Sequence, residues 1–66
     1  MNIHVNGEAQ RLAGPMNLSE LLVLLQLGDK RVAVELNGRI VPRSRHAQTV
    51  LAEGDELLIV QAIGGG

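Results

Sequence analysis

The residues whose types are best suited to chemistry stand at the end of the sequence, where Gly64, Gly65 and Gly66 follow one another. With glycine at 8 of 66 positions, three in succession at one given place arise by chance at about 0.002. Glycine lacks Cβ and adopts nearly any backbone conformation, so such a tail can extend into a narrow active site on another protein. This predicts that the terminal carboxylate of Gly66 is the reactive group. The alternative is a linker remnant, which the lack of following tag residues disfavours.

Other reactive side chains are missing or isolated. The chain has no cysteine, which excludes disulfides, thiolate metal sites and a cysteine nucleophile. It has no phosphate-binding loop, no nucleophile elbow and no zinc-binding helix motif. His4 and His46 are distant in sequence and are both expected at the surface, while Glu53, Asp55 and Glu56 surround a glycine turn typical of a solvated loop. We therefore expect no catalytic residue, no metal site and no bound cofactor.

The charge balance argues against nucleic acid and membranes as partners. Six Lys and Arg against seven Asp and Glu give a net charge of -1, and the aromatic content is 0%, which removes stacking platforms for bases. Five basic residues nevertheless fall close together: Lys30, Arg31, Arg39, Arg43 and Arg45. We expect a solvated face or a positive rim that orients an acidic protein partner, and the role of Arg39, Arg43 and Arg45 stays open.

The rest of the chain is expected to position the tail as one small domain over residues 1–66, with a flexible end at 64–66. Leu, Val and Ile make up one third of the residues, well above the level that marks disordered chains. The longest apolar run, residues 21–25, is far too short to span a bilayer, and the N-terminus lacks the features of a secretory signal. A cytoplasmic location is expected.

Turn signals and hydrophobic periodicity predict one helix among several strands. Asn17 and Glu20 resemble a capping box and predict a helix from about 18 to 26, with Gly28 as the residue that ends it. Leu18, Leu21, Leu22 and Leu25 form its core face. The predicted strands and turns are a hairpin over residues 1–12 with Asn6-Gly7 in its turn, a strand at 32–36, the turn Asn37-Gly38, a short strand at 39–41, an irregular or single-turn segment at 42–49, the turn Glu53-Gly54-Asp55 and a strand at 56–62.

This order of elements indicates an α+β fold, a mixed sheet of about four to five strands wrapped over one main helix with the last strand central. If Leu57 and Ile59 face the helix, then Leu58, Val60 and Ala62 face outward. A chain this small has no second layer to cover them, so they are predicted to form a partner interface. The alternative is a loop folded over that face.

Several segments together resemble the ThiS family, the sulfur carriers of thiamin biosynthesis, within the ubiquitin-like β-grasp proteins. These segments are Leu36-Asn37-Gly38, Ile40-Val41-Pro42-Arg43, Glu53-Gly54-Asp55-Glu56-Leu57 and the final Gly65-Gly66. The resemblance covers essentially the whole chain. The Gly-Gly end alone is shared with ubiquitin-like modifiers and with MoaD, the small subunit of molybdopterin synthase, but the Val41-Pro42-Arg43 segment favours ThiS.

The resemblance implies a mechanism that this chain does not catalyse. An E1-like enzyme would use ATP to adenylate Gly66, and sulfur derived from cysteine, delivered by a sulfur-donating enzyme, would displace AMP to leave a thiocarboxylate. That sulfur would pass to thiazole synthase. A terminal carboxylate is ionised at neutral pH and is a poor electrophile until activated, which agrees with this implication. A MoaD-like carrier, a protein modifier conjugated through Gly66 and a plain binding module remain alternatives.

Overall fold

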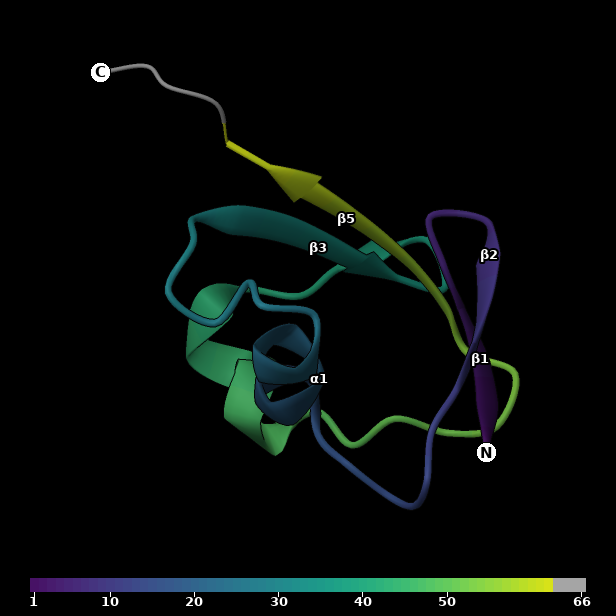
Figure 1. Ribbon diagram of the computed structural model, residues 1–66. Coiled ribbons are helices and arrows are strands. Elements are labelled where there is room, and N and C mark those ends of the chain that lie inside the picture. The colour runs from purple at the N-terminus through teal and green to yellow at the C-terminus, as the bar shows by residue number, and fades with distance from the viewer. Residues whose placement is uncertain (63–66) are drawn as a thin grey trace.

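A five-stranded mixed sheet curves around one side of a single α-helix in the computed structural model, which describes residues 1–62 (Figure 1). The elements are β1 (Asn2–Val5), β2 (Glu8–Arg11), α1 (Leu18–Leu24), β3 (Val32–Leu36), β4 (Arg39–Ile40), the 3-10 helix η1 (Arg43–Gln48) and β5 (Glu56–Gln61). The strand order is β2-β1-β5-β3-β4, with β5 parallel to β1 and antiparallel to β3. The predicted fold class and the central position of the last strand are confirmed.

Two Asn-Gly pairs make the tight turns of the sheet. Asn6 and Gly7 have φ values of 52° and 83°, and Asn37 and Gly38 have φ values of 51° and 85°. Two successive positive φ values are the signature of the type I′ turn, which asparagine and glycine adopt at low cost. The register pairs Val5 with Glu8 across the first turn. Both predicted hairpins are therefore present.

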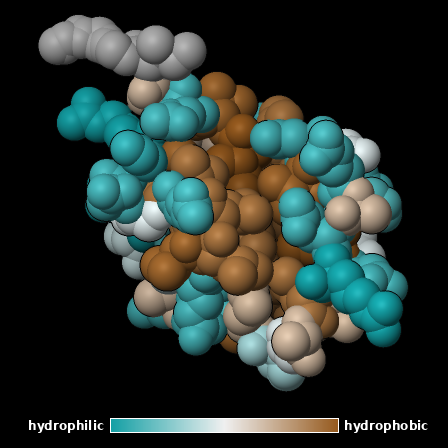
Figure 2. Space-filling model, viewed as in Figure 1, coloured by the Kyte–Doolittle hydropathy of each residue, from teal (hydrophilic) through white to brown (hydrophobic). Residues whose placement is uncertain are grey.

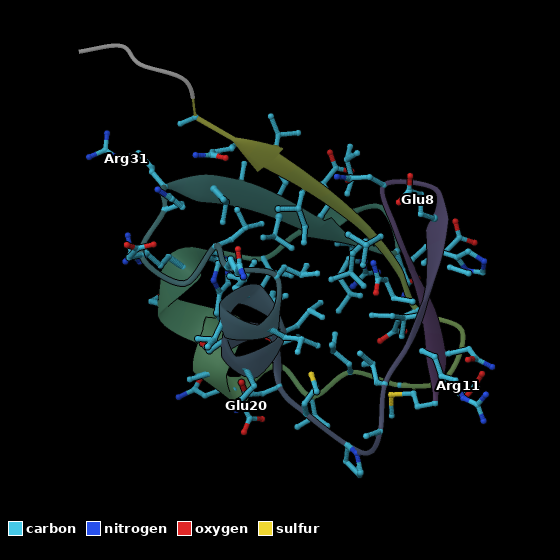
Figure 3. The ribbon with its side chains drawn as sticks, viewed as in Figure 1. Glu8, Arg11, Glu20 and Arg31 are labelled. Carbon is cyan, nitrogen blue, oxygen red and sulfur yellow. The ribbon has the colours of Figure 1, made fainter. Side chains whose placement is uncertain are left out.

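Helix α1 begins at the predicted cap. The backbone N–H of Glu20 donates to Oδ1 of Asn17, and the backbone N–H of Asn17 donates to Oε1 of Glu20, each over 2.8 Å. Figure 3 labels Glu20 at this end of the helix. The reciprocal bonds satisfy two of the donors that a helix start leaves free. Leu18, Leu21 and Leu22 are buried, so the helix face predicted from their spacing is the one that packs.

The predicted end of the helix is wrong. It was placed at Gln26 with Gly28 as the left-handed residue, but α1 stops two residues earlier and Gln26 itself takes the left-handed conformation, with φ at 64°. The backbone N–H of Leu27 then donates to the carbonyl of Leu22 over 2.7 Å, which closes a Schellman motif. The capped carbonyls offset the cost of positive φ at a residue other than glycine. Gly28 serves a different purpose, because a Cβ there would lie 3.0 Å from Cγ2 of Val23.

The segment between β4 and β5 also differs from expectation. It forms η1, and His46 within it is buried with 6% of its surface exposed, so the prediction of a surface histidine is wrong. Nε2 of His46 lies 3.0 Å from the carbonyl oxygen of Val41. This bond satisfies the polar edge of the ring while η1 packs beside α1, so the side chain can be buried without an unpaired donor.

The hydrophobic core lies between the concave face of the sheet and α1. It joins residues from three strands, the helix and two connecting segments: Ile3, Val5, Leu12, Leu18, Leu21, Leu22, Val34, Leu51, Leu57 and Ile59. In the part of the chain that the structure describes, no helix is long and apolar enough to cross a membrane.

Candidate functional site

The central strand β5 has two unlike faces. Leu57 and Ile59 point into the core and are 3% and 7% exposed, whereas Leu58 and Val60 are 48% and 55% exposed on the opposite face. Successive side chains of a strand point to opposite sides, so this alternation is the one predicted from the sequence. Ala62, directly after the strand, is also exposed.

Neighbouring strands extend the exposed side of β5 into an apolar patch. The register sets Ala33 opposite Val60 and Glu35 opposite Leu58, and Glu35 in turn lies opposite Ile40 on β4. Residues directly opposite share a face of the sheet, so these side chains project together. We call Ala33, Ile40, Leu58 and Val60 the outer face. Ile40 is 74% exposed, and at such exposures no segment within residues 1–62 covers this face.

The end of β5 is held on both sides. Towards β3, the register continues to Gln61, and the N–H of Ala62 donates to the carbonyl of Arg31 over 2.8 Å. Towards β1, the side-chain amide of Asn6 takes part: its Nδ2 donates to the carbonyl of Ile59 over 3.1 Å, and the N–H of Ile59 donates to its Oδ1 over 2.8 Å. The last described strand residues therefore have a defined position from which residues 63–66 continue.

The start of β5 is held by the second Asn-Gly turn. Oδ1 of Asn37 accepts from the N–H of Glu56 over 2.9 Å, and its Nδ2 donates to Oδ1 of Asp55 over 3.0 Å. Both asparagines were expected in turns for their backbone conformation, and their side-chain bonds to the last strand were not predicted. The Asn-Gly pattern predicts only the φ values of the turn. The strand to which the asparagine side chain bonds depends on the tertiary fold.

The five basic residues are all exposed. Lys30 and Arg43 line a shallow hollow between α1 and η1, beside His46. Arg39 lies on β4, and Arg31 projects away from the molecule at the start of β3 (Figure 3). Arg31 lies beside the end of β5, where its carbonyl accepts from the N–H of Ala62.

A second apolar surface surrounds the C-terminal end of α1. Figure 2 shows brown surface over this end of the helix and towards the sheet, with teal side chains on either side. Val23 and Leu24 are exposed there, and an open hollow nearby is lined by Leu25, Leu27 and Ile59 among others.

The predicted reactive group is the carboxylate of Gly66, which follows β5 in the sequence. The described residues do not include Gly64, Gly65 and Gly66. The expectation that these glycines form a mobile tail therefore lies outside the described residues as well. Among residues 1–62, no three His, Asp or Glu side chains gather in a way that would hold a metal ion. Within residues 1–62, the candidate site therefore consists of an exposed apolar sheet face and of a strand, held on both sides, that leads to the glycines.

Comparison with known proteins decides the family. The model of the ThiS family matches residues 3–66. The chain belongs to the ThiS family. It is 36% identical to the sulfur carrier protein ThiS of Escherichia coli K12, with all of both chains covered. It is similar to the crystal structure of ThiS from Geobacter metallireducens at 35% identity and a TM-score of 0.85, again over 100% of both chains. The resemblance read from the turns and the glycine end, and the β-grasp fold that it implied, are both confirmed.

Two further relatives are much longer. The chain is 42% identical over its full length to a thiazole synthase of Paramagnetospirillum magneticum and 39% identical to one of Magnetococcus marinus. It spans only about a fifth of the length of these curated relatives, since 20% of each is covered. A ThiS-family segment therefore occurs within longer proteins that bear the name of a thiazole-forming enzyme.

Proposed function

We propose that this chain carries sulfur for thiazole formation in thiamin biosynthesis, with the carboxyl group of Gly66 as the carrier. The observation that supports this most strongly is the match to the sulfur carrier protein ThiS of E. coli across the whole of both chains. The three glycines at 64–66 add support, because only residues without side chains pass easily through a narrow catalytic channel.

Activation of Gly66 is the first chemical step in this proposal. A carboxylate oxygen attacks the α-phosphorus of ATP, forms an acyl–oxygen–phosphorus bond and releases pyrophosphate. A hydrosulfide ion, whose sulfur derives from cysteine, then attacks the carbonyl carbon, forms a carbon–sulfur bond and breaks the carbon–oxygen bond to AMP. AMP leaves, and the sulfur loses its proton to solvent as the thiocarboxylate forms. The carboxylate is a poor electrophile before adenylation, so the energy of ATP is needed.

The catalytic groups belong to partners in this account. An E1-like adenylating enzyme binds ATP and activates Gly66, a sulfur-donating enzyme supplies the sulfur, and thiazole synthase receives it. The longer relatives named thiazole synthase support this last partner, because they contain a segment similar to this chain. Leu58, Val60 and Ala62 are the proposed contacts, since an exposed apolar sheet face without a covering layer is suited to docking.

The test is an intact mass of the protein made in its native host. A thiocarboxylate, a free acid and a conjugate differ in mass, and the measurement also reports whether Gly66 is the end of the chain. A thiocarboxylate at Gly66 supports the proposal. A conjugate to another protein would favour a modifier, and a longer chain without a carboxyl at Gly66 would contradict the carrier role. Loss of the thiocarboxylate on deletion of the host's molybdopterin pathway, with the thiazole pathway intact, would favour the MoaD-like alternative.

A further inference from the structure

We infer that Asn6 is a positioning residue for the reaction at Gly66, because its side chain fixes the end of β5 from which the glycine tail continues. This inference rests on the proposed function. The backbone pairing between β1 and β5 covers only a short stretch. The register joins His4 with Glu56 and Val5 with Leu57, and the N–H of Asn6 donates to the carbonyl of Leu57 over 2.8 Å. The backbone then turns away at Gly7.

The Asn6 amide continues the ladder where the backbone leaves it. A carboxamide offers one N–H direction and one carbonyl, the same groups as a peptide unit. Here Nδ2 donates to the carbonyl of Ile59 and Oδ1 accepts from its N–H, over 3.1 and 2.8 Å. Both bonds are partly buried and join positions 53 residues apart, so they tie the first hairpin to the last strand. One side chain thus stands in for the next residue of β1.

Beyond Asn6 an open hollow replaces a neighbouring strand. Ile59 and Gln61 line it together with Val5 and Leu27. Within residues 1–62, the end of β5 therefore has β3 on one side and the Asn6 amide on the other. Loss of the amide leaves the last strand residues paired only with β3, which permits lateral movement of the end of the strand.

The position of the end of β5 matters more for catalysis than for docking. Residues 63–66 follow this end of β5 in the sequence, and misplacement of a reacting group by about 1 Å can reduce a rate up to about 100-fold. Leu58 and Val60 remain paired with β3 through Glu35 and Ala33, so the outer face keeps its shape. We therefore expect loss of the Asn6 amide to lower kcat while KM stays nearly unchanged.

Asn37 provides a matched control. It occupies the same position of an equivalent Asn-Gly turn, with φ at 51° against 52° for Asn6, and its side chain also makes two hydrogen bonds at β5. These bonds hold Glu56 and Asp55, at the opposite end of the strand from the tail. Glycine keeps the positive φ at either position, so Asn6→Gly and Asn37→Gly each remove a side chain without straining the turn.

The experiment measures pyrophosphate release by the adenylating enzyme with ATP and each full-length chain as substrate. For Asn6→Gly we expect kcat to fall by about tenfold, with KM changed by less than about threefold. For Asn37→Gly we expect both constants to stay within about threefold of the unaltered chain, although its unfolding midpoint is also lowered. Equal kcat values for the two variants, or a change confined to KM, would overturn the positioning role.

A second readout needs no enzyme. The amide hydrogen of Ile59 should exchange with solvent at least about fivefold faster in Asn6→Gly than in Asn37→Gly, because only the first variant removes its acceptor. Unchanged exchange would overturn the inference at its structural step. If the enzyme releases no pyrophosphate with the unaltered chain, the proposed function is wrong. If the unaltered chain is a substrate but Asn6→Gly and Asn37→Gly have equal kcat values, only the role of Asn6 is wrong.

Discussion

The two faces of β5 are built from the same kinds of residue and have opposite surroundings. Leu57 and Ile59 lie in the core, and Leu58 and Val60, one position along from each, are about half exposed. Hydrophobicity does not separate the two pairs, since leucine and β-branched residues occur in both. What separates them is that α1 and η1 cover only one side of the sheet (Figure 1). Within residues 1–62, one apolar face of the central strand is therefore left uncovered.

This difference teaches that apolar residues in a small sheet protein have two separable purposes. The inner pair contributes most to the free energy of unfolding, and the outer pair contributes less because about half of each side chain stays exposed after folding. Substitutions at adjacent positions should therefore affect different measurements.

Truncation of the inner face should be the most damaging change. Leu57→Ala and Ile59→Ala each remove buried methyl groups and leave a cavity, and each is expected to lower the free energy of unfolding by about 2–5 kcal/mol. Chemical denaturation with urea measures this. The matched outer substitution Val60→Ala should change it by less than about 1 kcal/mol. Similar losses at Ile59 and Val60 would erase the distinction between the faces.

A charge on the outer face should affect binding instead of folding. Leu58→Glu places a carboxylate where an apolar partner surface is proposed, and we expect the free energy of binding to the adenylating enzyme or thiazole synthase to weaken by about 2 kcal/mol or more. Titration calorimetry measures binding, and urea denaturation of the same variant is the control. A variant that unfolds with no separate loss of binding would place Leu58 in the core.

The helix cap offers a smaller and more selective change. Asn17→Ala removes the acceptor for the N–H of Glu20, and we expect about 1 kcal/mol less stability. Because the cap lies on the side of the sheet that carries α1, binding through the outer face should not change. A loss of partner affinity without a loss of stability would show that the helix side also contacts the partner.

Local signals in the sequence were enough for the elements that depend on neighbouring residues. The Asn6-Gly7 and Asn37-Gly38 turns, the Asn17 cap and the alternation along β5 were each predicted correctly because their causes lie within a few positions. The strand ends were slightly overextended, since β5 stops at Gln61 rather than at Ala62.

One error was local, and the others came from contacts between distant parts of the chain. Helix α1 ends before Gln26 because backbone N–H groups there bond to carbonyls of the last helical turn. Glycine is the residue type that most often ends a helix, which is why Gly28 was expected in this place. His46 is buried because η1 packs beside α1 and a carbonyl of Val41 satisfies its ring. The side-chain bonds of Asn6 join the two ends of the chain, and no window of sequence contains both partners.

Transfer of sulfur to Gly66 can be tested directly by incubating the chain with its adenylating enzyme, ATP and a sulfur source. We expect a gain equal to the mass difference between sulfur and oxygen, located in C-terminal fragments. Oxidation of Met1 or Met16 adds nearly the same mass, so location is essential. A thiol-directed alkylating reagent should also label this chain, which contains no cysteine, and should do so only when ATP is present.

Deletion of Gly66 makes this measurement decisive. The shortened chain ends one residue early, by up to about 3.6 Å, which is large on the scale of active-site alignment. The account predicts that the full chain is labelled in an ATP-dependent manner and that the shortened chain is not. Labelling of the shortened chain as fast as the full one would show that the carboxyl group of Gly66 is not the carrier.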